Sequence, residues 1–279
     1  MDILTEEKKS FFDTFGFLAF PGLLADCIDE IIEAFETIWA QRGGGHNGQP
    51  HDGIRRSCIV PFIDQHERLC ALLDDPRIKE ILVGLLGENF NYMGSDGNYY
   101  AGDTQWHSDG WGKEIRFVKI ALYLDHLTRD TGCLRVIPGS HHLKDTYANN
   151  VENTVRNSQD EWDMHGPDIP ALALETNPGD VVLFNHNLKH AAFGGSPRRR
   201  MFTINCSERF PEDEEHIELL KTQIAARARF WNDRAYGKIM LATAGSERKK
   251  HLEQVMAHDD HLAELSARAR EEMPEPSRG

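Results

Sequence analysis

Apolar residues recur at helical spacing in the first part of the chain. Thr5-Glu6-Glu7-Lys8 has the composition of a capped helix start, and it is followed by one apolar face made of Phe11, Phe12 and Phe15. Similar patterns predict further helices at 25–41, at 76–86 and after residue 212. Helical segments are therefore expected at both ends of the chain.

Between about residues 91 and 210 the pattern changes to short apolar segments separated by turn residues. Strands are predicted at 98–101, 118–124, 133–137, 181–184 and 201–206. Turn signals such as Pro138-Gly139 and Asn177-Pro178-Gly179-Asp180 lie between them. Short strands with long insertions favour a two-sheet jelly roll over a repeated β-α-β unit.

These patterns together predict an α+β protein with a mainly β core. The core is expected to be a cupin-like double-stranded β-helix (jelly roll), flanked by N- and C-terminal helices. We expect one domain over 1–279, divided into a helical part at 1–90, a jelly-roll core at 91–210 and a helical part at 211–279. The C-terminal helices are candidates for a homodimer contact.

Composition narrows the choice of partners and compartment. The chain of 279 residues carries a formal net charge of −14, which disfavours a nucleic acid partner because phosphate backbones attract basic proteins. No apolar run is long enough for a membrane helix, and the N-terminus lacks the pattern of a secretory signal. The five cysteines are scattered and form no C-x-x-C pair. A cytoplasmic protein is the expectation.

One short segment contains a candidate metal site. In Gly102-Asp103-Thr104-Gln105-Trp106-His107-Ser108-Asp109 the histidine and the last aspartate are two positions apart. On a strand, such residues point to the same face, so both side chains can enter one barrel interior. With a third ligand from a distant strand they would form a facial triad, which suits iron(II). Two downstream histidines, His186 and His190, are candidates for that ligand.

Four motifs in this order resemble the phytanoyl-CoA dioxygenase family of iron(II)/2-oxoglutarate oxygenases. They are His107-x-Asp109, the turn Gly179-Asp180 before a strand, a distal histidine, and an arginine about ten residues later. The segment Thr131-Gly132, followed by Pro138-Gly139-Ser140-His141, also matches the family. The resemblance spans roughly residues 11–207. It implies His107, Asp109 and His190 as metal ligands, with His186 as the alternative to His190.

The resemblance also implies a cation for the distal carboxylate of 2-oxoglutarate. Arginine suits this role because its planar fork matches a carboxylate. Strand alternation puts Arg198 and Arg200 on one face and Arg199 on the other. The family pattern favours Arg200, and Arg199 stays an alternative. Further candidate contacts to 2-oxoglutarate are Asn98, Gln105 and Thr104.

The implied activity is hydroxylation of an unactivated C–H bond in a small-molecule substrate. Iron(II), 2-oxoglutarate and O2 would take part, with release of succinate and CO2. The carboxylate of Asp109 favours hydroxylation over halogenation, because related halogenases carry a small residue there. Candidate substrate contacts are Trp111 and His141, and candidate anchors for an anionic substrate group are Arg55, Arg56 and Arg135. The alternatives are a metal-dependent cupin-type enzyme that does not use 2-oxoglutarate and a non-catalytic jelly-roll binding protein.

Overall fold

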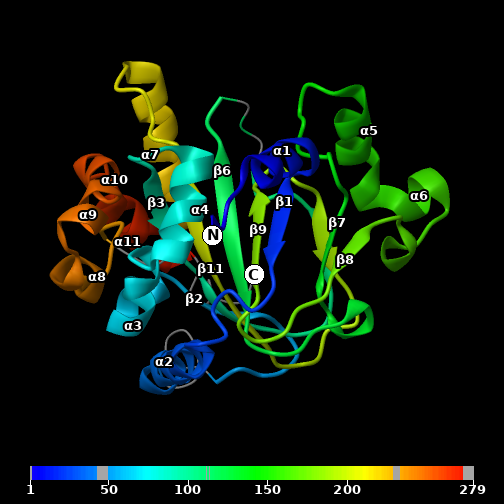
Figure 1. The fold of residues 1–279 in the computed structure, drawn as a ribbon, viewed down its shortest axis with the longest axis horizontal. Coiled ribbons are helices and arrows are strands. Elements are labelled where there is room, and N and C mark those ends of the chain that lie inside the picture. The colour runs from blue at the N-terminus through cyan, green and yellow to red at the C-terminus, as the bar shows by residue number, and fades with distance from the viewer. Residues whose placement is uncertain (1, 43–49, 111, 113, 229–232, 273–279) are drawn as a thin grey trace.

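The computed structural model describes residues 2–42, 50–110, 112, 114–228 and 233–272 (Figure 1). The first helix begins after Thr5, whose hydroxyl accepts a hydrogen bond from the Lys8 amide, and it ends at Gly16 with φ of 84°. The predicted N-terminal helices are present, and a strand follows the first of them. The elements of this part are α1 (Glu6–Phe15), β1 (Phe17–Phe20), α2 (Ile28–Gln41), β2 (Ser57–Ile59), α3 (Glu67–Cys70) and α4 (Pro76–Leu86).

Two antiparallel sheets form the centre of the molecule. The larger sheet has the strand order β1-β9-β6-β11-β4-β2, with β3 also paired to β11, and the smaller has the order β5-β10-β7-β8. This arrangement confirms the predicted jelly roll. The further strands of the larger sheet are β3 (Asn91–Gly94), β4 (Gly97–Tyr100), β6 (Phe117–Tyr123), β9 (Val181–Asn185) and β11 (Arg199–Ser207). The smaller sheet contains β5 (Thr104–His107), β7 (Leu134–Val136), β8 (Leu172–Leu174) and β10 (His190–Ala192).

Helices surround the sheets on both sides in Figure 1. Two helices that the sequence pattern did not predict, α5 (Thr146–Thr154) and α6 (Ser158–Trp162), lie beside β7 and β8. The C-terminal part is helical as predicted, and its helices lie on the opposite side, near β3. They are α7 (Glu214–Ala228), α8 (Lys238–Thr243), α9 (Ser246–Lys250), α10 (Glu253–Ala257) and α11 (Leu262–Glu272). No helix among the described residues is long and apolar enough to cross a membrane.

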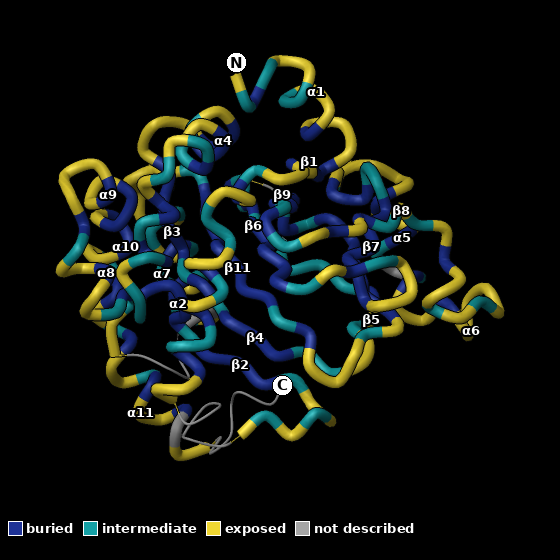
Figure 2. The backbone as a smooth tube through the Cα atoms, turned by 60° about the horizontal axis from the view of Figure 1, so that its bottom comes forward, coloured by how far each residue is buried: buried dark blue, intermediate teal, exposed yellow. Residues whose placement is uncertain are grey.

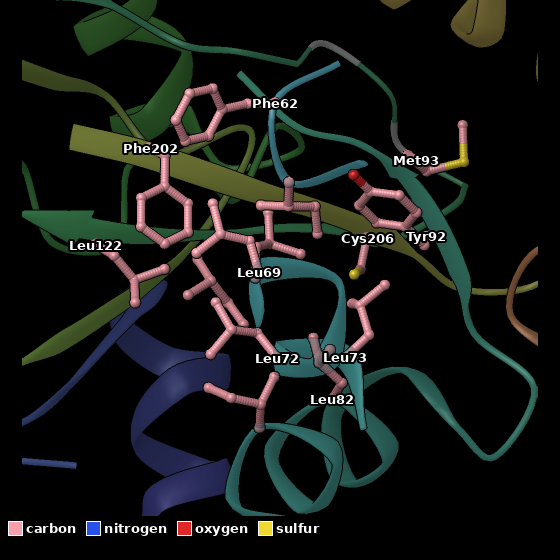
Figure 3. Packing of buried hydrophobic residues seen from close by; sticks show 14 of the residues in the cluster. Phe62, Leu69, Leu72, Leu73, Leu82, Tyr92, Met93, Leu122, Phe202 and Cys206 are labelled. Carbon is pink, nitrogen blue, oxygen red and sulfur yellow. The ribbon is translucent and has the colours of Figure 1, made fainter. Parts of the chain in front are cut away.

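The main hydrophobic core lies between the larger sheet and the helices that cover it. Phe202 of β11 and Leu122 of β6 point toward Phe62 and the leucines of α3 and α4 (Figure 3). In Figure 2 the central strands are mostly buried, whereas the outer helices are largely exposed. Because side chains alternate along a strand, the neighbours of Phe202 and Leu122 face the other way, into the jelly roll.

A buried carboxylate joins the C-terminal helices to the rest of the molecule. Asp64 is 1% exposed and accepts hydrogen bonds from the Tyr92 hydroxyl (2.7 Å) and the Gly237 amide (2.9 Å). Burial raises the pKa of Asp64 to about 6, since the charged form loses its hydration. This contact fixes the segment that precedes α8 against the jelly roll.

Candidate metal and co-substrate site

Two histidines face each other across neighbouring strands of the smaller sheet. His107 ends β5 and His190 begins β10, and the two residues are direct antiparallel partners with ring centroids 4.2 Å apart. The Nδ1 atom of His107 lies 2.7 Å from the carbonyl of Gln105, and that of His190 lies 2.9 Å from the carbonyl of Leu188. A proton on Nδ1 satisfies each carbonyl and leaves the Nε2 lone pair available to a metal.

Asp109 completes the cluster from a turn that follows β5. Its Oδ1 lies 4.0 Å from Nε2 of His107, and its Oδ2 lies 3.5 Å from Nε2 of His190. His107 and Asp109 point to one site, as expected, but the strand ends at His107, so strand alternation alone does not orient Asp109. The Asp109 amide instead donates to the carbonyl of His186 at 2.8 Å, and this hydrogen bond turns the chain so that the carboxylate points inward.

The charge states of the cluster suit a divalent cation. Burial lowers the pKa of His190 to about 3 and also lowers that of His107, so both imidazoles are neutral at pH 7. Burial opposes ionisation of Asp109, but Lys119 and the neighbouring histidines outweigh it and hold its pKa well below the usual value. One ligand atom from each of the three residues lies within 4.8 Å of the others. Two neutral imidazoles and one carboxylate match the donor set of a facial triad.

The triad opens into a cavity of about 360 Å³ inside the jelly roll. Its walls include alternate residues of the larger sheet, among them Lys119 and Tyr123 of β6 and Arg199 and Thr203 of β11. Burial raises the pKa of Tyr123, so its hydroxyl stays protonated. The cavity therefore joins the metal cluster to a polar wall.

Arg199 is the buried cation of this wall. Its side chain is 2% exposed, and its Nε and Nη1 atoms have no hydrogen-bond partner among the described residues. Two glycines make room for the guanidinium, since a Cβ atom at Gly132 or Gly195 would collide with Nη1. A buried arginine with free donors is costly on its own and indicates an anionic ligand in the cavity.

Arg200 lies outside the cavity, in contrast to the prediction that it faces the co-substrate. Arg200 points away from the cavity and forms ion pairs with Asp125 (2.6 Å) and Glu36 (2.9 Å). Arg198 lies on the same side and reaches Glu36 at 3.4 Å. The alternation of the three arginines is as predicted, and Arg199 is the one that faces inward.

The other residues expected near 2-oxoglutarate differ in position. Thr104 lines the cavity. Gln105 is exposed, and its contribution to the cluster is the carbonyl that contacts the His107 ring. Asn98 is fully buried but does not line the cavity, and it accepts a hydrogen bond from Nε of Arg56 at 2.8 Å. Asn98 therefore positions Arg56, which lines the cavity.

Apart from Arg56, the residues expected near the substrate lie elsewhere or outside the described residues. Arg55 is exposed and pairs with Asp52, and Arg135 donates to the carbonyls of Pro167 and Arg129. His141 packs beside Gly16, the residue that ends α1, and burial lowers the pKa of the His141 imidazole to about 4. None of these three lines the cavity. Trp111 lies outside the described residues.

Three charged residues of the cavity were not predicted as a group. Lys119 lies 2.7 Å from Oδ2 of Asp109, and Arg56 and Asp96 form an ion pair at 3.4 Å. Of these, Arg56 is one of the candidate anchors for an anionic substrate group, and it lines the cavity. Lys119 has a clearer signal, because it interrupts the apolar strand at 117–123. A lysine within a buried strand is uncommon unless it faces a polar cavity.

The jelly roll, its metal-ligand cluster and its buried arginine define a mononuclear non-haem oxygenase of the iron(II)/2-oxoglutarate class. The family model for phytanoyl-CoA dioxygenase (PhyH) matches residues 12–202, which is more than half of the chain. The chain belongs to the phytanoyl-CoA dioxygenase family. The predictions of family, fold and enzyme class are thereby confirmed.

Individual proteins agree with this assignment. A 2-aminoethylphosphonate dioxygenase from the uncultured bacterium HF130_AEPn_1 is 27% identical over 247 residues, covering 79% of this chain and 88% of that protein. The 2-oxoglutarate-dependent carbocyclase SnoK of nogalamycin biosynthesis superposes with a TM-score of 0.58 and 21% identity, covering 74% of this chain and 85% of SnoK. EctD from S. alaskensis, solved with 2-oxoglutarate and 5-hydroxyectoine, gives a TM-score of 0.55 and 22% identity over 74% and 77% of the two chains.

Proposed function

We propose that this protein hydroxylates a C–H bond of a small molecule, with iron(II) held by His107, Asp109 and His190. The observation that carries the proposal is the convergence of the three ligand atoms within 4.8 Å beside a buried arginine that has free donors. Metal binding without 2-oxoglutarate would not explain that arginine. A non-catalytic binding protein for an anion would explain the arginine but not the three converging ligand atoms.

Arg199 is the proposed anchor for the distal carboxylate of 2-oxoglutarate. Its buried Nε and Nη1 donors have no partner among the residues described, and a carboxylate accepts from a guanidinium fork through two parallel hydrogen bonds. Thr104 also lines the cavity and offers a hydroxyl. Both residues are therefore assigned to the co-substrate.

The chain's own residues provide position, charge and enclosure of the site. The Nδ1 contacts of His107 and His190 keep their Nε2 atoms turned to the metal, and the ionised Asp109 supplies one negative charge. When bound, iron(II) with 2-oxoglutarate supplies the activation of O2, which yields succinate, CO2 and a hydroxylated product. The walls of the cavity enclose His190 most, since 6% of its side chain is exposed.

The test compares metal binding and succinate formation in matched histidine variants. His190→Ala removes a proposed ligand, whereas His186→Ala removes a buried histidine outside the triad and keeps the backbone carbonyl that accepts from the Asp109 amide. We expect His190→Ala to lose stoichiometric iron(II) binding and succinate formation, and His186→Ala to keep iron(II) binding. Iron(II) binding by His190→Ala at the wild-type level would refute the assignment.

The partner and compartment are further parts of this proposal. All five cysteines are free, which supports a reducing compartment such as the cytoplasm. Apolar side chains of α8 and α10 are exposed, namely Ile239, Leu241 and Met256, and they support a homodimer contact through the C-terminal helices. Sedimentation measures the oligomeric state of the wild type and of Leu241→Glu. The introduced carboxylate should dissociate the dimer.

A further inference from the structure

The cavity carries an excess of positive charge. Among the described residues, its charged lining consists of three cations and two anions, namely Arg56, Lys119, Arg199, Asp96 and Asp109. The chain as a whole has a formal net charge of −14, so this excess is a local feature of the cavity.

The proposed cofactors do not remove the excess. Iron(II) and the 2-oxoglutarate dianion cancel each other in charge, so the loaded cavity keeps one uncompensated positive charge. An unpaired charge in a cavity of low dielectric is unfavourable unless a counter-ion neutralises it. The third component of the reaction, the substrate, is the available source of a negative charge.

Two residues are suited to receive that charge. Arg56 donates from Nε to Asn98 at 2.8 Å and from Nη2 to Asp96 at 3.4 Å, while its Nη1 donates to none of the described residues. A third of its side chain is exposed, and it lines the cavity. Lys119 contacts Asp109 at 2.7 Å and has further N–H donors.

Asp96 does not neutralise this pair of cations. It receives hydrogen bonds from Asn98 at 2.6 Å and from the Thr203 hydroxyl, in addition to Arg56. The Asp96 oxygens are thus already occupied, and the contact fixes the Arg56 guanidinium in one orientation. The carboxylate that contacts Lys119 is Asp109, the proposed iron ligand. An oriented arginine with a free Nη1 is prepared to bind an anion.

We propose that the substrate is a small organic anion whose carboxylate, phosphonate or sulfonate group binds between Arg56 and Lys119. The inference rests on the proposed function, because the charge balance assumes bound iron(II) and 2-oxoglutarate. It adds the chemical class of the substrate and names Arg56 as a specificity residue.

The experiment uses the protein loaded with iron(II) and saturating 2-oxoglutarate without oxygen. This complex should have a weak visible charge-transfer band, which shifts when a molecule binds beside the metal. The anionic probes are acetate, methylphosphonate and methanesulfonate, and the neutral probes of similar size are acetamide and dimethyl sulfone. We expect a saturable shift with at least one anion and none with the neutral probes. The anion that acts identifies the oxyanion type.

Arginine variants test where the anion binds. Arg56→Gln should weaken binding of the active anion at least tenfold while the 2-oxoglutarate band itself persists, which shows that the site is folded. Arg55→Gln is the matched control, because Arg55 is exposed and lies outside the cavity, and it should bind the anion as the wild type does. Arg56→Lys should recover part of the affinity.

Three results would overturn the inference: equal shifts with neutral and anionic probes, no shift with any anion, or wild-type anion affinity in Arg56→Gln. Loss of the band on adding the anion would mean that it displaces 2-oxoglutarate, which also refutes a separate site. Absence of the band before any probe is added would instead refute the proposed function, so the two failures are distinguishable.

Discussion

Nζ of Lys119 lies 2.7 Å from Oδ2 of Asp109, so a cation of the larger sheet contacts the carboxylate that the turn after β5 presents. This contact restricts the Asp109 carboxylate, which otherwise rests on the hydrogen bond of its own amide to His186. Groups that hold a metal ligand in place affect metal affinity although they do not touch the metal. Lys119 is thus a positioning residue for the proposed iron site.

Lys119→Met should weaken iron(II) binding by roughly tenfold to a hundredfold, because it removes the cation that pairs with the Asp109 carboxylate. Lys119→Arg keeps the positive charge, and its affinity should lie closer to that of the wild type. Competition with a chromophoric chelator under anaerobic conditions measures both affinities. If the methionine variant binds iron(II) as tightly as the wild type, Lys119 does not position the ligand.

Variants of the adjacent residues Arg199 and Arg200 test which arginine binds 2-oxoglutarate. Truncating one partner of a buried charge pair costs about 2–5 kcal/mol, so Arg199→Ala should lower 2-oxoglutarate affinity by roughly thirtyfold or more. Arg200→Ala breaks partly exposed ion pairs with Asp125 and Glu36, which are worth about 1 kcal/mol or less in stability, and should leave the affinity unchanged. Titration of the charge-transfer band measures both. The reverse result would restore Arg200 as the anchor.

The metal cluster could largely be predicted, whereas the arginine that faces the cavity could not. His107 and Asp109 are close in sequence, and the motif order pointed to His190. A shift of one residue exchanges the two faces of a strand, so the sequence alone does not decide which of the three arginines faces the cavity. The orientation follows from the pairing of Arg199 with Tyr100 and of Met201 with Tyr123.

The fold was predicted best where periodicity is strong. The apolar helices α2 and α4 and the strands β6 and β9 follow their patterns closely, whereas only Phe12 of the apolar face predicted for α1 is buried. The helices α5 and α6 were missed because α5 is polar and α6 is a single short turn. The positive excess of the cavity was not predicted, since Arg56 and Lys119 are 63 positions apart and line one cavity only when β2, which follows Arg56, and β6 join one sheet.

Gly132 should be required for co-substrate binding although it has no side chain. Its φ of 92° is unfavourable for other residues, and a Cβ atom would collide with the Arg199 guanidinium. Gly132→Ala should therefore displace Arg199 and raise the KM for 2-oxoglutarate, in addition to destabilising the backbone by about 1–3 kcal/mol. Succinate formation at varied 2-oxoglutarate concentration measures the first effect, and urea unfolding measures the second.

Gly87→Ala separates these two effects. Gly87 has a similar φ of 90°, but a Cβ atom there would have no atom within 4 Å. This variant should carry the backbone cost alone and keep the wild-type KM for 2-oxoglutarate. An equal rise in KM in both variants would mean that general destabilisation, not the Arg199 contact, is responsible.

The buried carboxylate of Asp64 should make stability depend on pH. Its pKa is about 6 in the folded protein and about 4 in an unfolded chain, so the folded state binds the extra proton between these values. A raised carboxyl pKa stabilises the fold at low pH, and this contribution disappears as the pH rises through about 6. The loss amounts to at most about 3 kcal/mol, from roughly two pKa units.

Asp64→Asn removes the titrating group and isolates this contribution. The variant should be less stable than the wild type at low pH, because its amide cannot accept from both Tyr92 and Gly237. The difference in the free energy of unfolding should then shrink as the pH rises from about 4.5 to 7, since only the wild type acquires a buried charge. Urea unfolding of the metal-free proteins across this range measures it, with the exposed Asp160→Asn as a control that should follow the wild type. A difference that stays constant or grows with pH would show that Asp64 is ionised throughout, held by its two donors against the cost of burial.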